Sequence, residues 1–118
     1  MKISTERKKQ LQAQYKQMKP DMGIFAVINK VNSRHYLEAV KNLKGKINRT
    51  EFQLKAGSHS NKELQKDWQQ LGQEEFEIIV LEFLEYDEDE SRTDYSDDLE
   101  LLNMDWIDKL TEQGIQFY

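Results

Sequence analysis

Two aromatic residues, Phe25 and Tyr36, stand near the two ends of the stretch MGIFAVINKVNSRHYLEAV, residues 22–40. A tyrosine hydroxyl can pass a proton to or from a reacting group, whereas a phenylalanine ring cannot. Glu38 follows Tyr36 by two residues, so in a β-strand both side chains leave the same face. Tyr36 could therefore move a proton. Taken alone, however, Tyr36 is ordinarily interpreted as a cross-strand aromatic that packs the sheet.

Cationic residues downstream of this stretch could contact phosphate groups. Lys46 and Thr50 lie four residues apart in a segment of helical composition, so they share one helix face. His59, in the loop KAGSHSN, is either a phosphate contact or a solvated turn residue. The candidate nucleic-acid contacts are Lys46, Arg49, His59 and Lys62. A further basic helix face, solvated or in contact with phosphates, is formed by Lys8, Lys9, Lys16 and Lys19.

The charges of the chain are divided between its two halves. Residues 1–70 contain 15 Lys and Arg against 6 Asp and Glu, whereas residues 71–118 contain 2 against 16. Neutralisation of phosphate dominates affinity for nucleic acids, so the basic N-terminal half is the candidate surface for DNA or another nucleic acid. The acidic C-terminal half is a candidate surface for a basic protein partner. The alternative is that the two halves neutralise each other within one fold.

Composition sets further bounds. A chain of 118 residues, 37% of them apolar, fits a single domain with one modest core. No apolar stretch approaches the roughly 20 residues of a membrane span, and the N-terminus lacks the apolar segment of a secretory signal. We therefore expect a cytoplasmic protein without membrane contact. The absence of cysteine excludes disulfides and thiolate metal sites, and two histidines argue against an all-protein zinc site.

The hydrophobic pattern predicts helices and strands in a definite order. Pro20 ends a first helix over residues 5–19, and Ser60 or Asn61 caps a helix that stops at Gly72. The apolar run FEIIVLEFL predicts a central strand that is covered on both faces. The predicted elements are strands over 23–29, 34–39 and 76–84, helices over 41–54, 62–71 and 98–112, and an acidic loop over 85–98. The predicted organisation is a basic N-terminal helix (1–20), one domain (21–112) and a C-terminal tail (113–118).

These motifs, in this order, resemble the GIY-YIG nuclease superfamily, in particular its small stand-alone bacterial members. GIF at 23–25 is similar to the first signature triplet, with Phe for Tyr, and YLE at 36–38 to the second, with Glu for Gly. The later matches are FQLKAGSHSNKELQKDW at 52–68, FEIIVLE at 76–82 and LLNMDWIDKL at 101–110. The resemblance implies an α/β fold of the α+β type, a three-stranded antiparallel sheet flanked by helices, with an extra N-terminal helix in this chain.

The resemblance also implies a chemistry, the metal-dependent hydrolysis of a nucleic-acid phosphodiester. In the family a tyrosine of the hairpin assists the attacking water, and an arginine contacts the phosphate. The first tyrosine position falls on Phe25, and the second is kept as Tyr36. The arginine falls on Lys46, which keeps the charge but loses the two-pronged geometry. His59 keeps a histidine that many members have in this loop.

The remaining family positions are also substituted. A histidine position falls on Thr50, and the glutamate that holds the metal falls on Asn103, whose neutral carbonyl is a poor substitute for a carboxylate on Mg²⁺. Loss of a positioned proton-transfer group at Phe25 forfeits about 10²–10⁴-fold in rate. A carboxylate such as that of Glu38, ~6 Å from a phosphate at an effective dielectric of ~20, repels it by about 3 kcal/mol. Glu100, one helical turn before Asn103, and Glu38 are the possible substitute metal ligands.

Three hypotheses follow. The first is a nuclease-like domain with an inactive or impaired centre and no cofactor, kept as a nucleic-acid-binding or regulatory module. It is motivated by changes at five family positions, Phe25, Glu38, Lys46, Thr50 and Asn103. The second is an active endonuclease that uses Mg²⁺ or Mn²⁺ with rearranged ligands. The third is a protein-interaction domain whose acidic half binds a basic partner.

Overall fold

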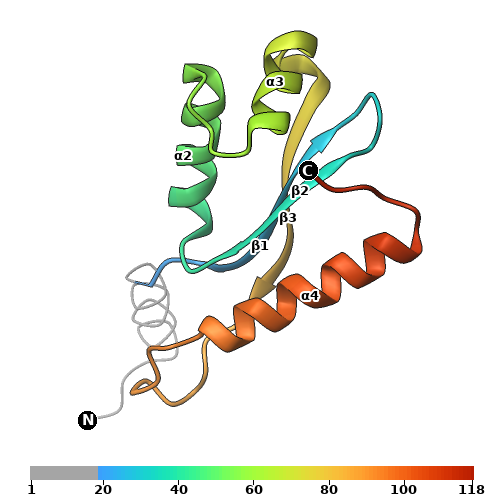
Figure 1. The fold of residues 1–118 in the computed structure, drawn as a ribbon. Coiled ribbons are helices and arrows are strands. Elements are labelled where there is room, and N and C mark those ends of the chain that lie inside the picture. Colours follow the sequence, from blue (N-terminus) through green and yellow to red (C-terminus); the bar gives the residue numbers. More distant parts are fainter. Residues whose placement is uncertain (1–18) are drawn as a thin grey trace, which may run out of the picture.

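The computed structural model describes residues 19–118, which form a three-stranded sheet with helices against it (Figure 1). The elements are β1 (Met22–Asn29), β2 (His35–Val40), α2 (Leu43–Ala56), α3 (Lys62–Leu71), the short 3₁₀ helix η1 (Gln73–Glu75), β3 (Phe76–Leu84) and α4 (Ser96–Glu112). Their order is the predicted one. The helix predicted over residues 5–19, including the lysines at positions 8, 9 and 16, falls outside the described residues except for Lys19. Among the described helices, none combines the length and apolarity needed to cross a membrane.

The sheet has the strand order β2-β1-β3, and both strand pairs are antiparallel. The central strand is β1, which is buried at every position but one. The prediction that residues 76–84 form the central strand is therefore wrong, because β3 is an edge strand. Its apolar run has a different cause. Phe76, Ile78 and Val80 pack on the main core, while Leu84 packs on a second cluster with α4 residues. A long apolar run thus indicates that both faces of a strand are covered, but it does not indicate that the strand is central in the sheet.

Two local features fix the hairpin and the start of β1. In the turn sequence KVNS, Asn32 is the residue type that tolerates left-handed geometry, but the residue with positive φ is Ser33, at 63°. Asn32 instead accepts a hydrogen bond from the Arg34 N–H, which closes the turn. At Gly23, a Cβ atom would collide with the carbonyl oxygen of Glu82 on β3. The glycine of the GIF triplet is therefore required by the close approach of β3.

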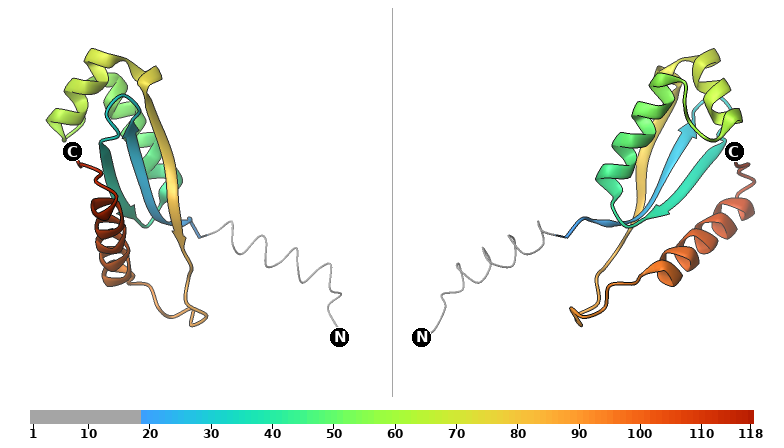
Figure 2. Two further views of the ribbon diagram at one scale, coloured as in Figure 1. Left: turned by 90° about the vertical axis from the view of Figure 1, so that its right-hand side faces the viewer. Right: turned by 60° about the vertical axis from the view of Figure 1, so that its left-hand side comes forward.

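The helices lie on opposite faces of the sheet. Phe25 and Val27 of β1 belong to an apolar cluster with residues of α2 and α3, such as Leu54 and Leu64. Met22 belongs to a second cluster with the α4 residue Leu99. Because successive side chains of a strand point to opposite faces, α2 and α3 cover one face and α4 covers the other. The right-hand view of Figure 2 shows α2 and α4 on either side of the strands.

The helices α2 and α3, which cover the same face of the sheet, both begin at asparagine N-caps. Asn42 accepts a hydrogen bond from the Gly45 N–H, and Asn61 accepts one from the Leu64 N–H. Asn61, one of the two predicted caps, is therefore the residue that starts α3. The spacing of Leu64, Trp68 and Leu71 in the sequence predicts one inward helix face, but the Leu71 side chain is 41% exposed. It is the last residue of α3, where the helix ends and the chain leaves the core.

Two segments of opposite charge lie on opposite sides of the sheet. Residues 41–71, which include α2 and α3, carry seven Lys or Arg and three Asp or Glu. Residues 85–118, which include α4, carry two and twelve. Each of the five ion pairs found among residues 20–118 joins two residues of the same half. In this part of the chain, ion pairing between the halves therefore does not neutralise them.

The predicted tail lies against the domain. Residues 115–118 return along the outer edge of β2, and the C-terminus lies beside that strand (Figure 1). The His35 N–H donates to the Gln116 carbonyl at 3.0 Å, and the Tyr118 N–H donates to the His35 carbonyl at 2.9 Å. Phe117 and His35 form a parallel β-bridge. The tail thus adds a very short fourth strand at one end of this edge.

Candidate functional site

Three of the predicted site residues meet on the face of the sheet that α2 covers. The Tyr36 hydroxyl donates to Oε2 of Glu38 at 3.3 Å, and the Glu38 Oε1 lies 3.3 Å from Nζ of Lys46. Tyr36 and Glu38 share a face of β2, as predicted, and Lys46 reaches them from the first turn of α2. The Glu38 carboxylate therefore binds both polar groups that would otherwise be available to a phosphate.

His59 completes this group from the loop before α3. Its ring meets the Tyr36 ring edge-on, with centroids 5.1 Å apart. The side chain is only 7% exposed, so it is not a solvated turn residue. Its Nδ1 lies 3.0 Å from the Asn61 N–H and accepts that hydrogen bond, which leaves the ring proton on Nε2. Burial lowers the pKa of His59, which favours the neutral ring.

Phe25 and Thr50 lie beneath this group and not in it. Both side chains are fully buried. Phe25 pairs with Glu38 across the hairpin and belongs to the main core. The Thr50 hydroxyl has no hydrogen-bond partner among the described residues. The side chains at these two candidate positions therefore belong to the core and not to an accessible site. Two other predicted contacts, Arg49 and Lys62, are exposed on α2 and α3.

Two of the predicted metal positions, Glu100 and Asn103, lie across from β2, on α4. A pocket of about 510 Å³ runs between β2 and α4, and Glu38, Glu100 and Asn103 all line it. The Asn103 Oδ1 atom is buried and has no hydrogen-bond partner within residues 19–118. The three residues named as metal ligands thus border one pocket at an edge of the sheet, with the Glu38 carboxylate held by Lys46 and Tyr36.

These residues do not fit a divalent cation in their present arrangement. The Glu38 carboxylate is paired with Lys46, and Asn103 supplies only a neutral oxygen. Glu100 is an exposed residue on α4. Across residues 19–118, no group of three or more His, Asp or Glu side chains is placed to hold a metal ion. Because Mg²⁺ is usually held by at least one carboxylate, this donor set does not fit it well.

The environment of Tyr36 gives a direct prediction. Burial, with the Glu38 charge as the second cause, raises the pKa of Tyr36 to about 12. The phenol form is thereby favoured, so Tyr36 adds to folding stability below pH ~10 and this contribution is lost as the pH rises from there toward 12. Absorbance titration of the protein, minus that of Tyr36→Phe, should show one tyrosine with a midpoint near 12. In Glu38→Gln the midpoint should fall but stay above that of a free tyrosine, because burial remains. A midpoint near 10 in the parent protein would contradict this assignment.

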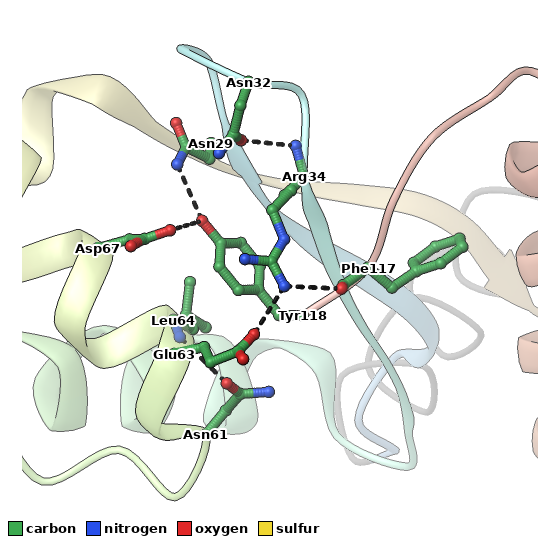
Figure 3. A network of polar contacts seen from close by, with 9 residues as sticks. All are labelled: Asn29, Asn32, Arg34, Asn61, Glu63, Leu64, Asp67, Phe117 and Tyr118. Carbon is green, nitrogen blue, oxygen red and sulfur yellow. Dashed lines mark hydrogen bonds and ion pairs between the residues drawn. The ribbon is translucent and has the colours of Figure 1, made fainter.

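A second polar network, around the C-terminal residue, was not predicted from the sequence. Figure 3 shows the Tyr118 ring between Arg34 and Asp67. The Tyr118 hydroxyl donates to Asp67 Oδ2 at 2.7 Å and accepts from Asn29 Nδ2 at 2.9 Å. The Arg34 Cζ lies 4.2 Å from the ring centroid, and the same guanidinium pairs with Glu63 of α3. The one available signal was Asn29, a polar residue at the end of an apolar strand that is fully buried here.

Comparisons with known proteins identify the fold. No protein-family model and no curated protein matches this sequence. Among solved structures, the catalytic domain of the homing endonuclease I-TevI is similar to this chain with a TM-score of 0.64 and 24% identity, over 80% of this chain and 94% of that one. A mutant of the catalytic domain of intron endonuclease I-TevI, in which a glutamate is replaced by alanine, gives 0.60 and 26%, over 83% and 92%. The predicted three-stranded antiparallel sheet with flanking helices is thereby confirmed.

Proposed function

We propose that this chain, which has the fold of a GIY-YIG homing-endonuclease catalytic domain, is a nucleic-acid-binding or regulatory module whose hydrolytic centre is inactive or impaired. It requires no metal cofactor for this role. The nucleic acid lies on the side of the sheet that α2 and α3 cover.

One observation carries the proposal, the position of the Glu38 carboxylate. It accepts a hydrogen bond from Tyr36 and pairs with Lys46, the two residues that match the family positions for water activation and phosphate contact. A carboxylate has the charge sign and the acceptor oxygens of a phosphate. Glu38 therefore acts as an internal substitute for a phosphate and occupies its two partners. A nucleic-acid phosphate at this point would have to displace it.

Two further features of the site agree with impaired hydrolysis. Phe25 provides no hydroxyl and is buried in the core, so it cannot be recruited by a small movement. Burial raises the pKa of Tyr36 to about 12, which makes the phenolate that could take a proton from water even rarer at neutral pH. A site without a proton acceptor at either tyrosine position lacks the group that generates the nucleophile.

Binding without hydrolysis needs cations that remain accessible. The exposed Lys and Arg residues of the α2 and α3 layer are Lys44, Arg49, Lys55, Lys62 and Lys66. Of these, Lys55 is paired with Glu51. Contacts of such residues with phosphates release counterions, so the affinity should fall steeply with salt.

Cleavage and binding assays with the full chain test this proposal. Supercoiled plasmid and single-stranded DNA and RNA are incubated with the protein in Mg²⁺ and in Mn²⁺. We expect no cleavage, together with a salt-dependent mobility shift that weakens in Arg49→Ala and Lys62→Ala. Nicking that disappears in Tyr36→Phe would contradict the proposal, and so would a lack of affinity for any nucleic acid at low salt.

The alternative function is an active divalent-metal-dependent endonuclease with rearranged ligands. The observation that favours it is the shared pocket of Glu38, Glu100 and Asn103, in which the Asn103 oxygen has no partner among the described residues. This function requires Glu38 to leave Lys46 and a carboxylate to face the pocket. Calorimetric titration with Mn²⁺ separates the two functions. Mn²⁺ binding that is lost in Glu100→Gln, together with nicking of plasmid, would support the active endonuclease. The absence of both Mn²⁺ binding and plasmid nicking would exclude it.

A further inference from the structure

The outer edge of β2 is only partly paired. His35 bonds to the tail through both its N–H and its carbonyl. In an antiparallel pair, the main-chain groups of every second residue point to the same side, so those of Leu37 and Ala39 also point outward. No hydrogen bond from these outward groups is found among residues 19–118. The tail covers one end of this edge and leaves the other end open.

The open end of the edge lines the pocket described above. Its lining includes five consecutive residues, from Leu37 to Lys41. Side chains on one face of a strand would contribute only every second residue. The unbroken series therefore indicates that the pocket runs along the edge itself, where the backbone is accessible. At about 3.3 Å per residue, this length accepts roughly four residues of an added strand.

The opposite wall of the pocket is one face of α4. Ser96, Leu99, Glu100 and Asn103 follow the spacing of three and four residues that places side chains on one helix face. The buried Asn103 Oδ1 lacks a donor within the described part of the chain, and an unpaired buried acceptor is costly. Because Asn103 lines the pocket, its side-chain amide is a local reporter of a ligand bound there.

The charge of this wall selects the kind of ligand. Glu100 is exposed at the pocket, and residues 85–118 carry twelve acidic side chains against two basic ones. Lys41, at one end of the lining, is the opposing cation. A phosphate chain would meet this negative potential without compensation, whereas lysine or arginine side chains would be attracted to it.

We propose that the groove between the outer edge of β2 and α4 binds an extended, basic peptide segment of a partner protein, which adds to the sheet as a strand. The chain's own tail already pairs with the same edge at His35. Strand addition uses main-chain hydrogen bonds for affinity and side-chain contacts for selection. This role goes beyond nucleic-acid binding, which we place on the α2 and α3 side.

The experiment uses the full chain and a synthetic peptide of alternating lysine and valine residues, followed by NMR of the backbone amides. We expect shifts at Leu37, Ala39 and the Asn103 side-chain amide. A peptide N-methylated at every second residue should bind about ten-fold more weakly, since it cannot donate along one edge. Glu100→Lys should weaken the basic peptide about ten-fold, whereas the same charge change at Asp108, exposed on α4 and outside the pocket, should weaken it only a few-fold.

Three outcomes would overturn the proposal. The first is the absence of shifts at Leu37 and Ala39 at millimolar peptide. The second is equal binding of the N-methylated peptide. The third is a single-stranded oligonucleotide that shifts these residues while the peptide does not. The nucleic-acid proposal is tested separately. It would fail if an oligonucleotide caused no chemical-shift changes on α2 and α3.

Discussion

Replacement of Glu38 by glycine should tighten the binding of a short single-stranded oligonucleotide by about 100-fold at low salt. The carboxylate occupies Tyr36 and Lys46 and opposes an incoming phosphate. Repulsion of about 3 kcal/mol, for charges ~6 Å apart at an effective dielectric of ~20, corresponds to this factor. The side chains of both partners are partly exposed, so salt screens the effect and the gain should shrink as the salt concentration rises. Fluorescence anisotropy of a labelled oligonucleotide measures it.

Two further variants separate charge from shape. Glu38→Gln keeps the size and a hydrogen-bond acceptor but removes the charge, and should give most of the gain. Glu51→Gln is the matched control, because Glu51 also pairs with a lysine of α2, at 3.0 Å, but lies outside the group around Tyr36. It should change the affinity by no more than a few-fold. Equal gains in Glu38→Gln and Glu51→Gln would show that only net charge matters, and would remove the special role of Glu38.

Replacement of Tyr118 by alanine should lower the free energy of unfolding by about 3 kcal/mol, the lower end of the range for loss of a large core ring, because Tyr118 is only partly buried. The ring packs against the main core and lies against the Arg34 guanidinium. Its hydroxyl is the partner of the Nδ2 atom of Asn29, whose side chain is fully buried. Loss of that partner leaves a buried donor unsatisfied. Urea unfolding followed by fluorescence measures the change.

The phenylalanine variant divides this effect. Tyr118→Phe keeps the ring but removes the bonds to Asn29 and Asp67, and should cost about 1–2 kcal/mol. Gln116→Ala, at an exposed side chain of the same tail, should stay within about 0.5 kcal/mol of the parent protein. A loss below about 1 kcal/mol for Tyr118→Ala would mean that the tail is only loosely attached to the domain.

Local signals in the sequence predicted most of the fold. The apolar periodicity located the strands and helices, and Asn61 and Gly72 marked the ends of α3 because caps act within a few residues. The signature triplets then indicated the topology. The apolar run at 76–84 did not reveal that β3 lies at the edge of the sheet. Strand order depends on contacts between segments that are distant in the sequence.

The candidate site was predicted as a set of residues and not as an arrangement. Tyr36 and Glu38 were placed on one face by the two-residue period of a strand. The contact of Lys46 with Glu38 depends on how α2 docks on the sheet, which no local pattern encodes. The contact between Tyr118 and Asn29, which are 89 residues apart, could not be predicted from any periodic pattern in the sequence.

The separation of charge across the sheet gives the molecule a large electric dipole. Residues 41–71 on one side and 85–118 on the other carry opposite net charges, although the whole chain has a formal charge of −5. As the molecule diffuses toward a polyanion, the electric field between them turns the α2 and α3 side toward the polyanion before contact. The α4 side then faces away into solvent, where a polycation can reach it. The surfaces that we propose for a nucleic acid and for a basic peptide therefore lie on opposite sides of the molecule.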